Sequence, residues 1–208
     1  MQKKTIDAIF KIWQNLQPKP QTELVYSNDY TLLIAVVLSA QATDIAVNKA
    51  TQHLFKIVDN PQEMLKLGEN KLKKYISSIG LFNSKASNII KLSQILIEKF
   101  DGKIPQNFEQ LNSLPGVGRK TANVVLNCAF GKPTIAVDTH VFRVANRIGL
   151  VKEINVEKTE FALLKTIPKK FLPHAHHWLI LHGRYVCTSR KPKCNDCKIN
   201  HLCEKIIN

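Results

Sequence analysis

Apolar side chains recur at helical spacing along most of the chain. One segment follows the i, i+3, i+4 spacing of an amphipathic helix, at Ala86, Ile89, Ile90, Leu96 and Ile97. Ser84 is its predicted N-cap, because a serine hydroxyl can accept a hydrogen bond from a backbone N–H of the first turn. The same spacing occurs one segment earlier, at Leu72, Tyr75, Ile76 and Ile79. Asp44 is expected to cap a further helix that runs through Ile57.

One run, Leu32–Leu38, is rich in branched residues and would suit a β-strand by itself. No nearby run alternates with a period of two, so such a strand would lack a partner. Turn-forming residues fall where helices are expected to begin or end, at Pro18, Pro20, Asn60-Pro61, Gly80, Gly102, Gly131 and Gly149. The sequence therefore predicts an all-α protein with nine or ten helices.

The composition indicates that the chain can form a hydrophobic core, and the net charge indicates the class of its partner. Hydrophobic residues make up 44% of the 208 positions and charged residues 22%, which is typical of a folded chain. The net charge of +14 indicates a polyanionic partner, most often nucleic acid and less often an anionic membrane. The longest uncharged stretch, Tyr30 to Thr43, is shorter than the roughly 20 residues of a membrane-spanning helix. We expect no membrane association, and a cytoplasmic location at the nucleoid, where disulfides are rare.

Four of the five cysteines lie close together near the C-terminus. Their spacing is C-x6-C-x2-C-x5-C, at Cys187, Cys194, Cys197 and Cys203. Four thiolates suit either tetrahedral zinc or a cubane iron–sulfur cluster. Zinc sites usually have two close pairs of ligands, whereas this segment has one, Cys194 and Cys197. Basic residues surround the cysteines, and Lys191 and Lys193 on this loop are candidate phosphate contacts.

A second motif, L-P-G-V-G-R-K-T-A, starts at Leu114. Gly116 and Gly118 permit positive φ and leave no side chain between the backbone and a partner. Val117 is expected to turn into the core, and the next helix to begin near Arg119. The N–H groups at that helix start would face the same space as the glycines, which suits one DNA phosphate without regard to base sequence.

Lys120 and Asp138 carry the candidate chemistry. Lys120 follows the glycines in the first helical turn, where the helix N-terminus and Arg119 disfavour another positive charge. A neutral amine is a nucleophile that can form a Schiff base. Asp138 precedes an apolar-periodic helix and suits its N-cap. Taken alone, these residues read as an ordinary surface lysine and a capping aspartate.

The glycine motif, the V-D-T-H segment at Val137 and the cysteine spacing occur in an order that resembles the endonuclease III family. These are bacterial DNA glycosylases with abasic-site lyase activity, in the helix–hairpin–helix superfamily. The resemblance also covers L-S-A-Q-A-T-D from Leu38 and I-G-L-F-N-S-K from Ile79, and spans nearly the whole chain. The resemblance and the cysteine spacing together favour a [4Fe–4S] cluster over zinc as the group that the four cysteines hold.

The resemblance implies specific roles. Lys120 is the catalytic amine and Asp138 the essential carboxylate. Gln41 lies in the loop that fills the gap left by an extruded nucleotide, and Leu81 in the opposing wedge. The hairpin residues that contact DNA are Gly116, Val117, Gly118 and Arg119, and the four cysteines hold the cluster.

The resemblance also implies two helical domains with a DNA-binding groove between them. Residues 1–20 and 133–208 would form one, with the cluster loop at 187–203. Residues 21–132 would form a central bundle, with the helix–hairpin–helix at about 108–130. The expected substrate is double-stranded DNA with damaged bases or abasic sites, and the expected state is a monomer.

The expected activity is excision of oxidised pyrimidines, followed by strand cleavage 3′ to the abasic site. Mismatch or alkylated-base glycosylases of the same superfamily are the alternative. The adenine-mismatch branch is less favoured, because Lys120 is present and the run from Tyr30 to Thr43 holds no carboxylate. A non-catalytic iron–sulfur DNA-binding or redox-sensing protein is a further alternative, which intact Lys120 and Asp138 disfavour.

Several other residues receive structural interpretations. Trp13 and Trp178 are expected in the core, and Cys128 as a small buried residue. Three nearby histidines, His174, His176 and His177, follow a predicted helix start at Pro173 and are expected at a cap or the surface.

Overall fold

The computed structural model describes residues 1–206, and those residues form helices and loops without a β-strand. They divide into two compact units, Met1–Thr22 with Gly131–Asn208 (unit 1) and Glu23–Phe130 (unit 2). The all-α prediction is confirmed, although the described part of the chain has eleven α-helices and two short 3₁₀ helices rather than nine or ten.

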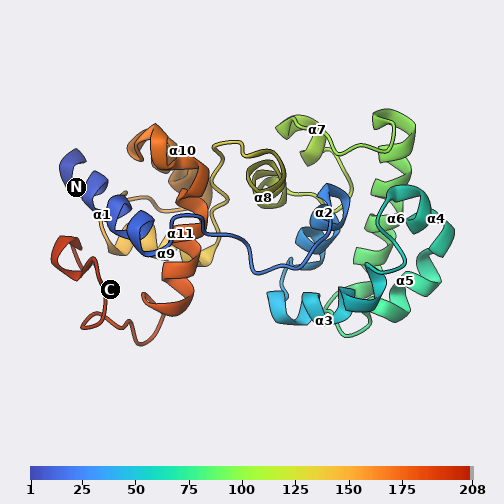
Figure 1. The fold of residues 1–208 in the computed structure, drawn as a ribbon, viewed down its shortest axis with the longest axis horizontal. Helices are drawn as coiled ribbons and strands as arrows, with labels where there is room; N and C mark the ends of the chain where they lie inside the picture. Colours follow the sequence, from blue (N-terminus) through green and yellow to red (C-terminus); the bar gives the residue numbers. More distant parts are fainter. Residues whose placement is uncertain (207–208) are drawn as a thin grey trace. The chain divides into compact units, whose positions relative to one another are not determined.

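Unit 2 contains seven helices (Figure 1). They are α2 (Asp29–Leu38), α3 (Asp44–Leu54), α4 (Pro61–Leu67), α5 (Glu69–Ile76), α6 (Phe82–Phe100), α7 (Phe108–Asn112) and α8 (Arg119–Phe130). Unit 1 contains the others. They are α1 (Lys3–Leu16), α9 (Thr139–Arg147), α10 (Val156–Thr166), η1 (Lys169–Phe171), α11 (Leu172–Tyr185) and η2 (Asn200–Leu202).

The central helix of unit 2 is α2, which is buried from Tyr30 to Leu38 and contacts α3, α6 and α8. A helix that is apolar on every side is stable only when other helices surround it. Its start is fixed by a capping box, in which the Asn28 side chain accepts from the Thr31 N–H and the Thr31 hydroxyl accepts from the Asn28 N–H. This explains why a branched run that would suit a strand is helical.

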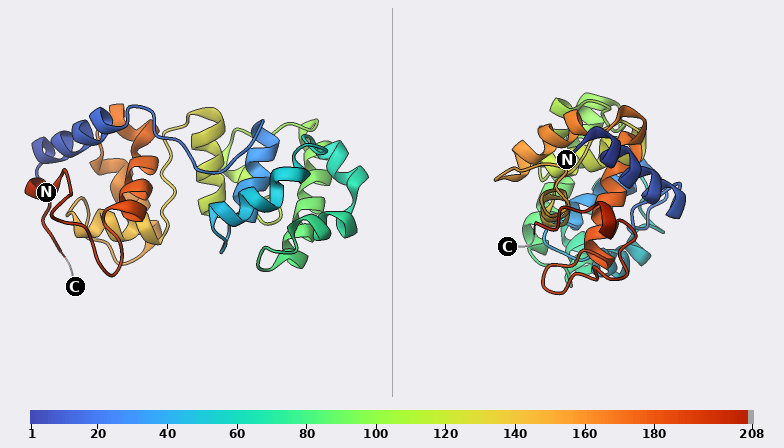
Figure 2. Two further views of the ribbon diagram at one scale, coloured as in Figure 1. Left: turned by 60° about the horizontal axis from the view of Figure 1, so that its bottom comes forward. Right: turned by 90° about the vertical axis from the view of Figure 1, so that its left-hand side faces the viewer.

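Unit 1 is built around an aromatic cluster. Phe10 of α1 stacks on Phe171 with ring centroids 5.4 Å apart and lies 6.1 Å from the Trp178 ring of α11. Trp178 also donates from Nε1 to the Gln17 carbonyl at 2.9 Å. These contacts hold α1 against α11. Figure 2 shows the ribbons of the two helices, blue and orange, near each other in unit 1. Trp13 and Trp178 are buried, as predicted.

Two predicted helix caps are wrong by a short distance. Thr43, not Asp44, caps α3, since its hydroxyl accepts from the Ala46 N–H at 3.2 Å. Ser84 is not the N-cap of α6, because that helix already begins at Phe82 and Ser84 donates back to the Leu81 carbonyl. The cap position belongs to Leu81, whose backbone is left-handed, with φ of +60°.

The prediction for the clustered histidines is also wrong in part. His176 and His177 are 3% and 6% exposed, so they belong to the interior of unit 1 rather than to its surface. The helix starts at Leu172, one residue before Pro173, which places both rings in its buried second turn. Burial lowers the pKa of His177 from 6.5 to about 4, with His174 contributing repulsion.

Candidate nucleic-acid interface and metal centre

The glycine motif forms the turn between α7 and α8. The helix α8 begins at Arg119, as predicted, and Val117 is 4% exposed and anchors the turn in the core. Gly116 has φ of +79°, a conformation that L side chains rarely adopt, whereas Gly118 does not. The Arg119 guanidinium lies 5.3 Å from the Phe108 ring centroid, so it also links α8 to α7. The turn therefore has a fixed shape with two exposed glycines.

Lys120 lies in the first turn of α8, directly after the glycine turn, and its side chain is exposed. Its neighbours from Thr121 to Asn127 are buried, so the helix behind it is anchored in unit 2. An exposed amine on an anchored helix start can reach a substrate while its backbone stays in place.

Gln41 and Leu81 share an unusual geometry. Both have left-handed backbone, with φ of +57° and +60°, and both side chains are exposed. A bulky residue such as leucine in this region is strained, and such strain often marks a binding site. Leu81 is 63% exposed, which is costly for an apolar side chain unless a partner covers it. The backbone therefore presents each side chain from a turn.

Lys85, which the sequence analysis did not single out, lies between these two turns. It is only 6% exposed, and its Nζ donates to the Leu38 and Ala40 carbonyls at 3.0 and 2.7 Å. Burial lowers its pKa from the usual value. One sequence signal could have indicated that Lys85 is buried, because it lies one turn before Ile89 on the apolar face of the predicted helix.

Asp138 is the N-cap of α9, as predicted. Its Oδ1 accepts from the backbone N–H groups of His140 and Val141, each at 2.9 Å. Two such bonds hold the carboxylate in one orientation at a positively polarised helix end. The side chain is half-buried, in unit 1, whereas Lys120 belongs to unit 2.

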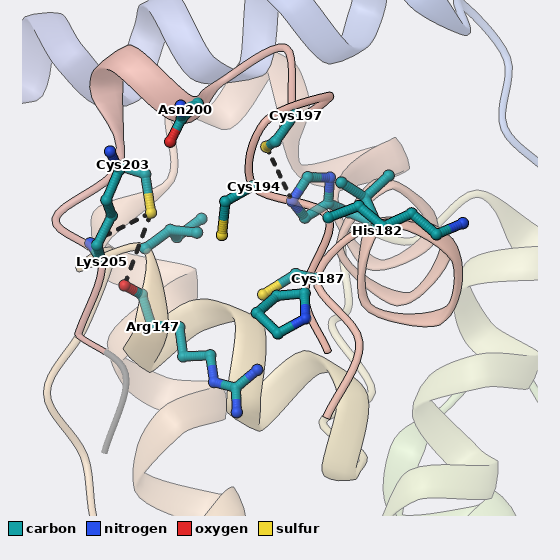
Figure 3. A pocket seen from close by; sticks show the side chains of 12 residues that line it. Arg147, His182, Cys187, Cys194, Cys197, Asn200, Cys203 and Lys205 are labelled. Carbon is teal, nitrogen blue, oxygen red and sulfur yellow. Dashed lines mark hydrogen bonds between the residues drawn. The ribbon is translucent and has the colours of Figure 1, made fainter. Parts of the chain in front are cut away.

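The four clustered cysteines line one cavity (Figure 3). They come from the segment that follows α11, and none of them forms a disulfide. The centre of a water molecule can occupy about 30 Å³ of this space, which is more than one water requires. Across the described residues, no three His, Cys, Asp or Glu side chains come together as a set that could hold a single metal ion. The thiols surround a space instead of meeting at a point.

The thiols of this cavity are partly shielded from solvent. Burial raises the pKa of Cys197 and of Cys203, which favours their neutral forms until a cation is near. The Lys205 backbone N–H lies 3.3 Å from the Cys203 sulfur and donates to it. His182 Nε2 lies 3.9 Å from the Cys197 sulfur, and burial lowers the pKa of His182 to about 4, so this ring is neutral near pH 7. These features are consistent with a metal cluster.

Two arginines of α9 brace the loop that carries the cysteines. Arg143 donates to the Gly183 carbonyl at 2.8 Å and to the Cys187 carbonyl at 3.1 Å. Arg147 donates to the carbonyls of Thr188 and Ser189, each at 2.8 Å. The sequence analysis did not identify this role, because both arginines lie some 40 residues from their acceptors. Lys191 and Lys193 remain exposed on the braced loop.

The other singled-out residues have simpler environments. Cys128 on α8 is partly buried rather than fully in the core, and burial raises its pKa to about 12. No helix in the described part of the chain is long and apolar enough to span a membrane.

Comparison with known proteins places this arrangement in a family. Residues 34–169 match the family model described as HhH-GPD superfamily base excision DNA repair protein. Endonuclease III of Rickettsia prowazekii (strain Madrid E) is 61% identical over 208 residues, covering 100% of this chain and 98% of that protein.

Solved structures agree with this relationship. A trapped endonuclease III–DNA covalent intermediate has a TM-score of 0.91 and 44% identity, over 99% of this chain and 97% of that one. A thermostable thymine-DNA glycosylase has a TM-score of 0.83 and 26% identity, over 97% and 96% of the two chains. The chain therefore belongs to the endonuclease III family, within the HhH-GPD superfamily of base excision DNA repair proteins.

Proposed function

We propose that this protein is a bifunctional DNA glycosylase and abasic-site lyase that excises oxidised pyrimidines from double-stranded DNA. The observation that carries the proposal is the position of Lys120, exposed in the first turn of α8 immediately after the glycine turn. The family membership and the covalent DNA intermediate of a 44% identical relative support an amine nucleophile.

The glycine turn binds one phosphate of the damaged strand. Backbone N–H groups at the start of α8 and around Gly116 and Gly118 are the donors, and the absence of side chains allows close approach. Lys191 and Lys193 bind further phosphates and contribute to the salt dependence of binding. These contacts hold the strand without reading its sequence.

The target nucleotide must leave the base stack, because C1′ cannot be reached inside a duplex. Gln41 fills the gap that the nucleotide leaves, and Leu81 enters the stack from the opposing turn. Their contacts offset the stacking that is lost, and the apolar Leu81 side chain is covered by bases when DNA is bound.

Lys120 then performs the chemistry. Its neutral Nζ attacks C1′, the C1′–N bond breaks, and the base departs with the bonding electrons and takes up a proton. The Asp138 carboxylate either accepts the proton of Lys120 or stabilises the positive charge that develops at C1′. The C1′–O4′ bond then breaks as the Nζ lone pair forms a double bond to C1′, and O4′ takes up a proton. The product is a protonated imine (iminium) between Nζ and C1′.

Strand cleavage follows from the imine. The iminium group acidifies C2′–H, so a base removes that proton and the C3′–O bond breaks. The 3′ phosphate leaves with its electrons, which is β-elimination. Water finally hydrolyses the imine and releases Lys120.

The four cysteines hold a [4Fe–4S] cluster. Thiols arranged around a cavity suit a cubane better than zinc, because four sulfurs at about 2.3 Å from one zinc ion would lie about 4 Å or less from one another. Four cysteine ligands would leave such a cluster no open position for a substrate, so its contribution would be to fold the loop that carries Lys191 and Lys193. Protein purified without oxygen should contain iron and inorganic sulfide in equal amounts, and zinc in their place would contradict the cluster.

The test of the activity uses duplexes with one abasic site, one thymine glycol or one adenine mismatch. Incision of the first two and not of the third is the expected result. The structural likeness to a thymine-DNA glycosylase makes a mismatch activity the second candidate, and a G·T duplex tests it. Release of thymine without oxidised-pyrimidine excision would replace the proposal by that alternative.

A further inference from the structure

The buried amine of Lys85 occupies the end of a helix. The last carbonyls of an α-helix have no partners within the helix and carry the negative end of its dipole. Leu38 is the final residue of α2, and Ala40 lies two residues beyond it. Lys85 donates to the carbonyls of both, at 3.0 and 2.7 Å. The ammonium therefore acts as a C-cap for α2 that comes from another helix.

The residue that follows this cap is Gln41. Few backbone hydrogen bonds hold its turn, chiefly Ala42 N–H to the Ser39 carbonyl at 3.1 Å. A left-handed glutamine at φ of +57° needs its surroundings to hold it in place. The Lys85 bond to the adjacent Ala40 carbonyl is the shorter of its two bonds, and it fixes the peptide directly before Gln41.

The same lysine holds the other turn through its backbone. The Lys85 N–H donates to the Leu81 carbonyl at 3.0 Å, which closes the first turn of α6 behind the left-handed Leu81. One residue thus contacts both turns, one through its main chain and one through its side chain. The α2 and α6 helices also contact each other directly (Figure 1).

The next turn of α6 extends the arrangement to the glycine turn. A Cβ placed on Gly116 would lie 3.1 Å from the Cβ of Asn88 and 3.2 Å from its Nδ2. Leu81, Lys85 and Asn88 are spaced four and three residues apart, so they lie along one face of the helix. The start of α6 therefore lies against the Gln41 turn and the glycine turn, and itself bears the Leu81 turn.

We propose that Lys85 is a positioning residue that fixes the separation of Gln41 and Leu81, and so sets the efficiency with which a nucleotide is extruded. This inference rests on the proposed function, because it assigns those two side chains to the gap and the wedge. Lys85 does not contact the reacting atoms, so its loss affects the extrusion of a stacked base and leaves the lysine chemistry intact.

The test compares Lys85→Met with Lys91→Met. Methionine keeps most of the length of the lysine side chain and removes the charge and the hydrogen bonds. Lys91 is exposed on the same helix and is the matched control. Single-turnover excision from a thymine glycol duplex should fall about tenfold or more in Lys85→Met only, as expected for loss of a buried charge-assisted bond.

Two further readouts separate positioning from folding. Borohydride trapping on a single-stranded abasic oligonucleotide needs no extrusion and should be unchanged in Lys85→Met. The fluorescence change of 2-aminopurine beside a tetrahydrofuran abasic analogue in duplex DNA, which reports local unstacking, should be reduced. Two results would overturn the inference. One is the same rate of duplex excision in Lys85→Met and Lys91→Met. The other is a loss of trapping by Lys85→Met on single-stranded DNA as large as its loss of excision on duplex DNA.

Failure of the proposed function would be visible separately, since the wild-type protein would then trap no abasic DNA. If Lys85→Met does not fold, Lys85→Gln is used with Lys91→Gln. Glutamine can donate to one carbonyl, so an intermediate loss of duplex excision is expected, and no difference between these two variants would overturn the inference.

Discussion

Gly116 of the glycine turn lies against Asn88 of α6 so closely that a Cβ on the glycine would stand 3.1 Å from the Asn88 Cβ. The backbone of Gly116 is also left-handed, at φ of +79°. Gly118, two residues later, has neither constraint, since no atom lies within 4 Å of its hypothetical Cβ. Position 116 therefore requires glycine for its backbone conformation and its close contact, whereas position 118 has space for a Cβ.

Gly116→Ala should destabilise unit 2 by about 1–3 kcal/mol, because the alanine must adopt a strained φ and displace Asn88. Gly118→Ala should leave the stability almost unchanged. Urea unfolding of both variants measures the difference. Affinity for abasic duplex should fall in both, because each methyl group intrudes on the phosphate site. Equal stability of the two variants would contradict the geometry of the turn.

Asp138→Asn should separate the capping role of this residue from its chemical role. Asparagine is as good an N-cap as aspartate, so the stability and the affinity for abasic duplex should stay close to wild type. The rate of base release should fall at least tenfold, because the carboxylate charge is lost.

Asp138→Ala is the companion variant. It should show the same slow base release and, in addition, lose about 1 kcal/mol of stability with the cap. The two measurements are single-turnover excision and thermal unfolding. Base release by Asp138→Asn at the wild-type rate would reduce Asp138 to a cap alone.

The buried His177 should make the protein less stable in mild acid. Its pKa is about 4 in the folded chain and 6.5 in the unfolded chain, so the unfolded state binds the proton more readily. The contribution of the neutral His177 to the free energy of unfolding is fully present above pH 6.5 and is lost as the pH falls towards 4. Between pH 7 and pH 5 this amounts to about 2 kcal/mol.

His177→Asn should reduce that dependence on pH. Urea unfolding at pH 7, 6 and 5 measures it, with His201→Asn, at an exposed position, as the control. His182, whose pKa burial also lowers to about 4, contributes the same kind of dependence in both proteins. A wild-type slope in His177→Asn would therefore show that His177 itself makes no contribution.

The sequence predicted most of what local chemistry determines. Asn60-Pro61 begins a helix, Val117 is buried, and Asp138 is an N-cap, because each depends on residues within one turn. The order of the motifs carried the family resemblance, which the comparisons confirm. The roles of Lys120 and Asp138 in the reaction stay predictions.

Features that depend on distant residues could not be predicted in the same way. Lys85 binds carbonyls 45 and 47 residues away, and no local pattern identifies them. The left-handed Gln41 and Leu81 break the rule that such positions are glycine, so sequence signals of turns do not reveal them. His176 and His177 were misplaced because their neighbours in α11 are buried as well, and a polar side chain gives no local signal of such burial.

The most direct test of the central claim is borohydride trapping on an abasic duplex by wild-type protein, Lys120→Gln and the surface control Lys91→Gln. The account predicts a covalent protein–DNA adduct with the wild type and with Lys91→Gln. It predicts none with Lys120→Gln, whose affinity for the same duplex should remain close to wild type. A wild-type amount of adduct from Lys120→Gln would contradict the assignment of the nucleophile.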